Sequence, residues 1–261
     1  MNRHLRIYWA MLKINFAYLL AYRANFITHL ISAFSWGAFQ IVWIVLLTGK
    51  RGVVFGWTQK DMILLTLGFF MVIGIFHFLF SSNFYLFSRV IDRGEFDAIL
   101  LKPIDSQFHS TMRVVNYANF VRACVGLILI IGWLVMNHYT VTFIQIVLFS
   151  FYIVVGIITT YSIWLLFMTT LIWYPSLNNM VEFLFTLNGF MKYPGEMIRF
   201  SGTIVLYLLL PLVLAVSTPV KILVRKNSLE DMIVLSLIAI CLFIISRLFW
   251  KYALKSYTSA S

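Results

Sequence analysis

Charged residues are scarce in this sequence, and acidic residues are the scarcest. Asp, Glu, Lys and Arg together make up 11% of the 261 residues, and only nine residues are acidic. A soluble domain carries about a quarter charged residues, so a chain this poor in charge cannot cover an ordinary water-facing surface. Hydrophobic residues make up 62% of it. The sequence therefore predicts an all-α polytopic membrane protein, because helices satisfy their own backbone hydrogen bonds inside a bilayer.

Other scarcities exclude several kinds of site. The two cysteines, Cys124 and Cys241, lie far apart in separate apolar runs, and we interpret them as small buried hydrophobic residues rather than as a disulfide. No Cys and His spacing typical of a metal site occurs, and no set of catalytic residues stands out. The net charge of +11 is spread over loops without a nucleic-acid-binding motif. It predicts contact with anionic lipid and no nucleic-acid partner.

The chain also lacks a phosphate-binding loop. Its only Gly-Lys pair, Gly49-Lys50, has neither the upstream glycine nor the following Ser or Thr that such a loop requires. We therefore predict that the chain does not hydrolyse ATP and binds no cofactor of its own.

Long apolar stretches predict where the chain crosses the bilayer. A span needs about 20 mainly apolar residues, and we expect six transmembrane helices, at about 26–48, 62–86, 116–136, 141–172, 177–192 and 231–250. Residues 1–23 gather their cations on one side of a helix and apolar residues on another, which predicts a helix lying in the membrane interface. The distribution of Lys and Arg favours a cytoplasmic position for both termini.

The apolar stretch 195–224 is interrupted by Pro211 and Pro219. Proline costs about 3 kcal/mol inside a helix, and broken backbone at membrane depth persists only where protein covers it or water reaches it. We expect this stretch to enter the bilayer from the outside and return, as a re-entrant outer hairpin before the last span. Two distorted spans within 174–226 are the alternative.

Nearly half of the acidic residues gather in one segment, 88–113, which this topology places in the cytoplasm: Asp92, Glu95, Asp97 and Asp105. Within it, Gly94 and Pro103 bound a short stretch that predicts a helix at 94–103. Its apolar face consists of Phe96, Ile99 and Leu100. An amphipathic helix with an acidic rim at the base of the membrane is a docking element for a partner. A solvated loop without a partner is the alternative interpretation.

Two motifs carry a resemblance to a known family. The pattern Arg-Gly-x-x-Asp-x-x-Leu-x-Lys-Pro at 93–103 resembles the first cytoplasmic loop of bacterial ABC type-2 exporter permeases, most of all the six-span subfamily of this length. Tyr193-Pro194, followed by Pro211 and Pro219, is similar to the outer segment of that subfamily. The resemblance extends over the whole chain in length, order of spans and placement of loops.

The resemblance implies roles for matching positions. Residues 1–261 would form a single permease domain in the bacterial cytoplasmic membrane. Its ATPase-coupling residues would be Arg93, Gly94, Glu95, Phe96, Asp97, Leu100, Lys102 and Pro103. The outer gate would consist of Tyr193, Pro194, Pro211 and Pro219. The implied partners are separate ATPase subunits, which carry ATP and Mg, and a second permease chain, identical or related.

Glu182, the acidic residue in the short predicted span 177–192, is a candidate for the substrate path, because ionisable residues inside membranes commonly serve function. We therefore expect the permease subunit of an exporter that moves an amphiphilic or hydrophobic substrate. A membrane-embedded enzyme acting on lipid- or isoprenoid-linked substrates, or an ion-coupled transporter, is the alternative. An enzyme would need clustered carboxylates or histidines, and an ion-coupled transporter would be expected to carry more buried charge than Glu182.

Overall fold

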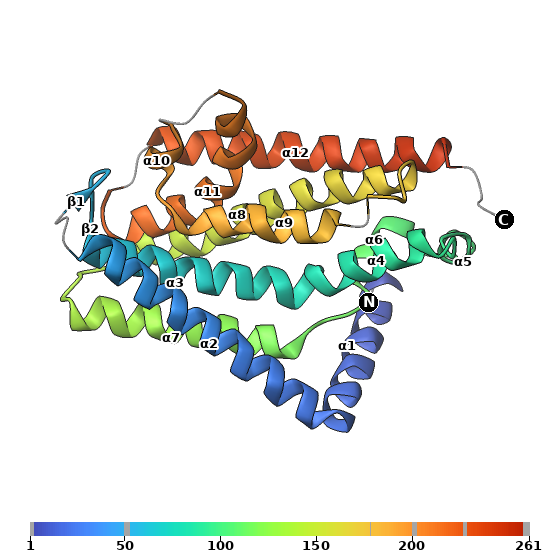
Figure 1. Cartoon of the computed structure of the whole chain (residues 1–261), viewed down its shortest axis with the longest axis horizontal. Coiled ribbons are helices and arrows are strands. Elements are labelled where there is room, and N and C mark those ends of the chain that lie inside the picture. The colour runs from blue at the N-terminus through green and yellow to red at the C-terminus, as the bar shows by residue number, and fades with distance from the viewer. Residues whose placement is uncertain (1–2, 50–52, 178, 200–202, 227–228, 258–261) are drawn as a thin grey trace.

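The long apolar runs form helices that lie side by side along the long axis of the molecule (Figure 1). The computed structural model describes residues 3–49, 53–177, 179–199, 203–226 and 229–257. At one end of the bundle, the strands β1 (Val53–Val54) and β2 (Trp57–Thr58) form an antiparallel hairpin. The described residues are otherwise helices and the loops that join them, as predicted.

Five helical segments are long and apolar enough to cross a membrane. The first is α2 (Arg23–Thr48). The second combines α3 (Gln59–Phe76), the π-helical turn η1 (His77–Ser81) and α4 (Ser82–Asp92). The other three are α7 (Tyr117–Met136), α8 (Phe143–Thr169) with the 3-10 turn η2 (Thr170–Ile172), and α12 (Leu229–Lys255). The prediction of a polytopic helical membrane protein is confirmed.

The predicted span at 177–192 is shorter than the other five. It contains α9 (Met180–Asn188) and the 3-10 turn η3 (Gly189–Lys192). Together these cover fewer than the ~20 residues that a complete crossing needs. The chain then continues into α10 (Gly195–Arg199) and α11 (Thr203–Leu223), which pack against each other.

Helix α11 continues through both of its prolines, contrary to the expected break at Pro211 and Pro219. Every residue from 211 to 223 is buried, and the helix packs against α8, α3 and α12. A helix surrounded by other helices tolerates the missing backbone donors, because neighbouring protein shields the affected turns from lipid. The prolines are therefore accommodated by tertiary packing.

Close helix contacts depend on glycines at the crossings. A Cβ atom at Gly74 of α3 would lie 2.9 Å from the backbone nitrogen of Ala123 in α7. A Cβ atom at Gly156 of α8 would lie 2.4 Å from the carbonyl oxygen of Ala215 in α11. Real side chains do not approach so closely, so these pairs of helices require glycine at their crossing points.

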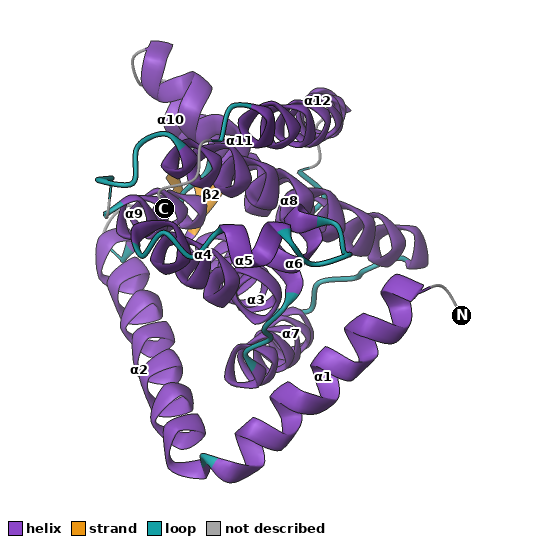
Figure 2. Cartoon of the chain, turned by 90° about the vertical axis from the view of Figure 1, so that its right-hand side faces the viewer, coloured by secondary structure: helices purple, strands orange, loops and turns teal. Residues whose placement is uncertain are grey.

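The first helix, α1 (Arg3–Ala21), lies across one end of the bundle and meets α2 at a sharp turn (Figure 2). The start of α1 and the end of α12 lie toward the same end of the molecule, opposite the β1–β2 hairpin (Figure 1). The hydroxyl group of Tyr117 donates to the carbonyl oxygen of Leu12 at 3.0 Å, and the rings of Phe16 and Tyr117 lie 5.6 Å apart. This position fits the interfacial helix expected for 1–23.

Cys124 and Cys241 are exposed at the surface of the chain, and the expectation that they are buried is wrong. The apolar surroundings of each cysteine in the sequence are the reason for the error. In a membrane protein, an apolar side chain can face either lipid or a neighbouring helix without contact with water. Hydrophobicity alone therefore does not indicate burial within the protein.

Candidate functional site

The predicted coupling segment forms two short helices at the same end of the bundle as the start of α1: α5 (Asp97–Leu100) and α6 (Ser106–Met112) (Figure 1). Gly94 has a φ of 69°, a left-handed conformation that glycine adopts without strain. The amide of Glu95 donates to the carbonyl oxygen of Val90 at 2.9 Å and so closes the end of α4. The helix expected at 94–103 is thus confined to the single turn of α5.

Phe96 is fully buried within the chain itself. Its ring lies 5.6 Å from Phe87, 6.2 Å from Trp250 and 5.3 Å from Tyr257, in edge-to-face arrangements. The expectation that Phe96 faces a partner is therefore corrected, because this side chain fastens the loop to α4 and to the end of α12. Ile99 is also buried.

The apolar side chain that does face outward is Leu101, which is 85% exposed. It directly follows α5, beside the half-buried Leu100. Around it the exposed coupling residues are Arg93, Gly94, Glu95, Lys102 and Pro103, whereas Asp97 is half-buried. The helical periodicity of 94–103 did not reveal Leu101, because α5 ends before it.

Asp105 holds the second half of the segment in place. Its carboxylate accepts a hydrogen bond from the amide of Phe108 at 2.9 Å and forms an ion pair with Arg247 of α12. Arg247 also donates to Gln107 at 2.6 Å. Partial burial alone would raise the pKa of Asp105, but the hydrogen bonds from Arg247 and Phe108 outweigh it, so the pKa lies below its ordinary value. Asp105, one of the four clustered acidic residues, is an internal tether.

The end of the bundle that holds the β1–β2 hairpin carries the predicted gate residues. Tyr193 has extended backbone, as the residue before a proline prefers, and Pro194 is buried at the start of α10. A Cβ atom at the adjoining Gly195 would lie 3.5 Å from Leu214 and Ser217 of α11. Because these two residues lie between Pro211 and Pro219, the structure brings the four gate residues to one pair of helices.

Ion pairs that the sequence did not reveal fasten this end. The ammonium group of the buried Lys221 lies 2.6 Å from a carboxylate oxygen of Glu196 and also pairs with Asp231. Trp57 donates to Glu196 at 2.9 Å and so links β2 to α10. A second pair joins Lys226 to Asp61 at 2.7 Å. These partners come from distant parts of the sequence, so local patterns did not predict them.

Glu182 is exposed and lines an open cavity of about 380 Å³, to which α2, α3, η1, α7, α9 and η3 contribute residues. Its other polar lining residues are Gln40, His77, Arg122, Thr186, Asn188 and Lys192. The ammonium group of Lys192 donates to the side-chain oxygen of Gln40 at 2.7 Å. The guanidinium of Arg122 stands 4.5 Å above the ring of Phe70, and this side chain is only 6% exposed. Arg122, near the start of α7, therefore faces the interior of the bundle.

A comparison with family models decides the family. Residues 34–261 match the model of the ABC-2 family transporter protein, which is most of the chain. The chain belongs to the ABC-2 transporter family. It is an integral membrane permease of an ABC transporter, and permeases of this family work with ATP-binding cassette subunits. A comparison with curated proteins found no match, and a comparison with solved structures found none.

A second cavity of this ABC-2 permease, about 280 Å³, lies between α2, α3 and α7. Its lining is mainly apolar and includes Phe34, Ile41, Leu67 and Leu129. It shares Gln40, Phe69 and Arg122 with the cavity that contains Glu182. The cavity that contains Glu182, which is the more polar of the two, and the apolar cavity therefore share the buried side chain of Arg122.

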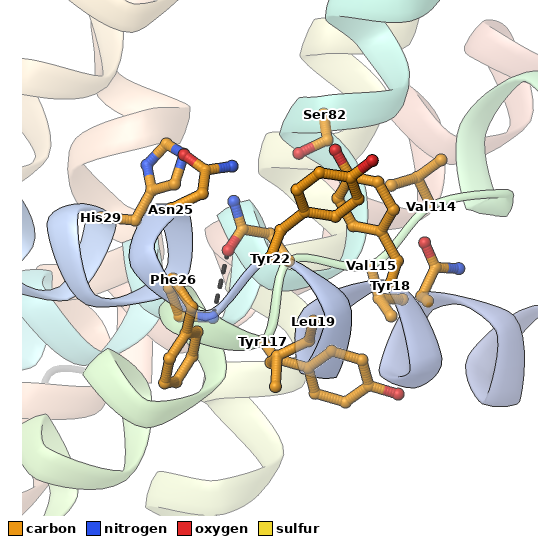
Figure 3. Close-up of a pocket in the computed structure, with 13 residues that line it drawn as sticks. Tyr18, Leu19, Tyr22, Asn25, Phe26, His29, Ser82, Val114, Val115 and Tyr117 are labelled. Carbon is orange, nitrogen blue, oxygen red and sulfur yellow. Dashed lines mark hydrogen bonds between the residues drawn. The ribbon is translucent and has the colours of Figure 1, made fainter.

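A third cavity, about 210 Å³, lies at the turn between α1 and α2 (Figure 3). The rings of Tyr18 and Tyr22 lie 4.5 Å apart and point toward Ser82. Asn15, in α1, donates to the carbonyl oxygen of Arg113 at 3.2 Å. These contacts attach the turn to the permease bundle, so a change in the angle between α1 and α2 would alter this cavity.

Proposed function

We propose that this chain is the membrane-spanning subunit of an ATP-driven exporter, which moves an amphiphilic or hydrophobic substrate across the bacterial cytoplasmic membrane. Separate ATP-binding cassette subunits bind ATP and Mg and carry out the hydrolysis. The observation that carries the proposal is the 88–113 segment: α5 and α6 are fastened rigidly to α4 and α12 while Leu101 and its charged neighbours face outward.

Rigid attachment is the property that force transmission requires. Phe96 links the segment to Trp250 of α12, and Asp105 links it to Arg247 of the same helix. Phe96 also packs on Phe87 of α4, so a push on the exposed residues beside α5 is passed to two spans rather than absorbed in a mobile loop. Leu101 serves as the apolar anchor for the ATPase, and the surrounding charges orient it, as rim charges do at other interfaces.

The proposed topology places both termini and the 88–113 segment in the cytoplasm and the β1–β2 hairpin outside. Helix α9 with η3 then completes a sixth, short crossing, and α10 with α11 forms the re-entrant outer hairpin before α12. Two such chains, identical or related, assemble around a common path. The support for the hairpin is the packing of α10 on α11 and the ion pairs of Lys221 with Glu196 and Asp231.

Co-purification with the ATPase subunit tests the docking site. Leu101→Ala should weaken retention of the ATPase by the full-length permease, since truncating a buried interface anchor commonly costs ≥2 kcal/mol. Leu229→Ala is the matched control, because Leu229 is 73% exposed at the start of α12, near the outer end. ATP-driven transport by the reconstituted complex should fall with Leu101→Ala alone. Equal retention and transport by both variants would show that this surface does not bind the ATPase.

A further inference from the structure

The polar and apolar cavities that meet at Arg122 carry an inference about the substrate, which rests on the exporter proposed above. We infer that together they form one binding site for an anionic amphiphile. Its head group is held near Arg122 and Lys192, and its apolar part lies between α2, α3 and α7.

Within the part of the chain that the structure describes, Arg122 has no counter-ion. It is almost fully buried, and among the described residues no carboxylate forms an ion pair with it. The guanidinium lies instead against the face of the Phe70 ring. A charge in the membrane interior is costly unless it pairs with another charge or lines a polar path. An anionic ligand in the adjoining cavity supplies the missing countercharge.

Further hydrogen-bonding groups at this cavity are also unused. Nε of Arg122, Nδ2 of Asn188 and Nε2 of His77 are buried and have no hydrogen-bond partner among the described residues. Asn188 is only 3% exposed, and its side-chain oxygen already accepts from Trp164, which leaves its amide donor free. The guanidinium and the amide are donors. A head group with several acceptor oxygens, such as a phosphate, matches them.

Glu182 does not cancel this preference for an anion. It lies ten residues before Lys192 along α9 and η3, a separation of about 15 Å at the rise of a helix. Asn188 lies between them, close to Lys192 along the chain. The single lining carboxylate is therefore separated along the helix from Lys192 and Asn188. Among the described lining residues, the two cations Arg122 and Lys192 stand against this one carboxylate.

The apolar cavity determines what the anion is attached to. Thr66, one of its few polar lining residues, donates its hydroxyl to the carbonyl oxygen of Met62, so its hydrogen is already used. Phe34, Ile41 and Leu129 offer only apolar contact. Because both cavities are lined by Arg122, one ligand can occupy both of them. Its anionic head group lies beside the cations, and its hydrocarbon chain lies in the apolar cavity.

Lipid binding to the purified full-length chain tests the inference by native mass spectrometry. The probes are phosphatidylglycerol, phosphatidylcholine with the same acyl chains, and inorganic phosphate. The unmodified chain should retain phosphatidylglycerol preferentially. Arg122→Gln and Lys192→Gln should each reduce that preference about tenfold, the effect of one lost charge-assisted hydrogen bond. Arg122→Lys should retain part of it.

Two further variants make the measurement specific. Lys251→Gln removes an exposed cation near the end of α12 and should leave the preference unchanged. Ala38→Phe fills the apolar cavity and should weaken binding of both lipids while phosphatidylglycerol stays preferred. Size-exclusion chromatography checks that each variant folds, and Lys192→Gln decides the matter if Arg122→Gln aggregates.

The outcomes separate this inference from the exporter itself. An unchanged lipid preference in Lys192→Gln overturns the head-group site. Displacement of phosphatidylglycerol by equimolar inorganic phosphate, with no effect of Ala38→Phe, shows a site for free anions and overturns the amphiphile. Either result leaves ATP-driven transport by the assembled complex intact. If the complex transports nothing while lipid preference follows the two cations, the exporter fails and the binding site remains.

Discussion

Replacing Phe96 by alanine should release the 88–113 segment from the bundle. The Phe96 side chain is fully buried and contacts the rings of Phe87, Trp250 and Tyr257. Truncating a buried phenylalanine to alanine costs about 3–5 kcal/mol, because apolar contact is lost and a cavity remains. Loss of the edge-to-face pairs belongs to this cost, at about 0.5–1.5 kcal/mol for each pair.

The comparison with Leu101→Ala gives this prediction its control. Leu101 lies five residues away and is 85% exposed, so its truncation should change stability by no more than about 0.5 kcal/mol. Phe96→Leu keeps most of the buried volume and should fall between the two. The three variants thus separate the stability of the segment from its capacity to bind a partner.

Hydrogen–deuterium exchange of the purified chain measures the effect locally. In Phe96→Ala, amides between residues 90 and 100 should exchange at least about a hundredfold faster, which corresponds to about 3 kcal/mol. Exchange in α8 should not change, because that helix lies outside the Phe96 contacts. If these amides exchange at the same rate in Phe96→Ala and in Leu101→Ala, Phe96 does not fasten the segment. The reasoning from burial is then refuted.

Two further predictions concern the same end of the molecule and the topology. The pKa of Asp105 is lowered in the folded chain, so its ionised carboxylate stabilises the fold above pH about 4, and this stabilisation is lost as the pH falls further. Asp105→Asn should therefore remove this pH dependence of the thermal unfolding temperature. In a cysteine-free background, a membrane-impermeant thiol reagent should label Val53→Cys in intact cells, and Leu101→Cys only after permeabilisation. Both side chains are exposed, so reversed labelling would invert the topology.

The sequence by itself determined the class of protein and much of its local structure. Sparse charge and long apolar runs were sufficient for a helical membrane protein, because the length of a span follows from the thickness of the bilayer. Gly94 correctly marked the end of a helix, since its left-handed conformation is a local property of the backbone. The motif at 93–103 led to the family that residues 34–261 match.

Tertiary structure decided what each side chain contacts. Phe96 and Leu101 are both apolar and close in sequence, yet one is buried and the other exposed, because α12 returns to cover only the first. Asp105 meets Arg247 across 142 positions of the chain. Arg122 faces a cavity because α2 and α9 leave space beside it. In a bilayer, lipid and neighbouring helices offer the same apolar surroundings, so hydrophobic periodicity cannot distinguish them and only the packed structure does.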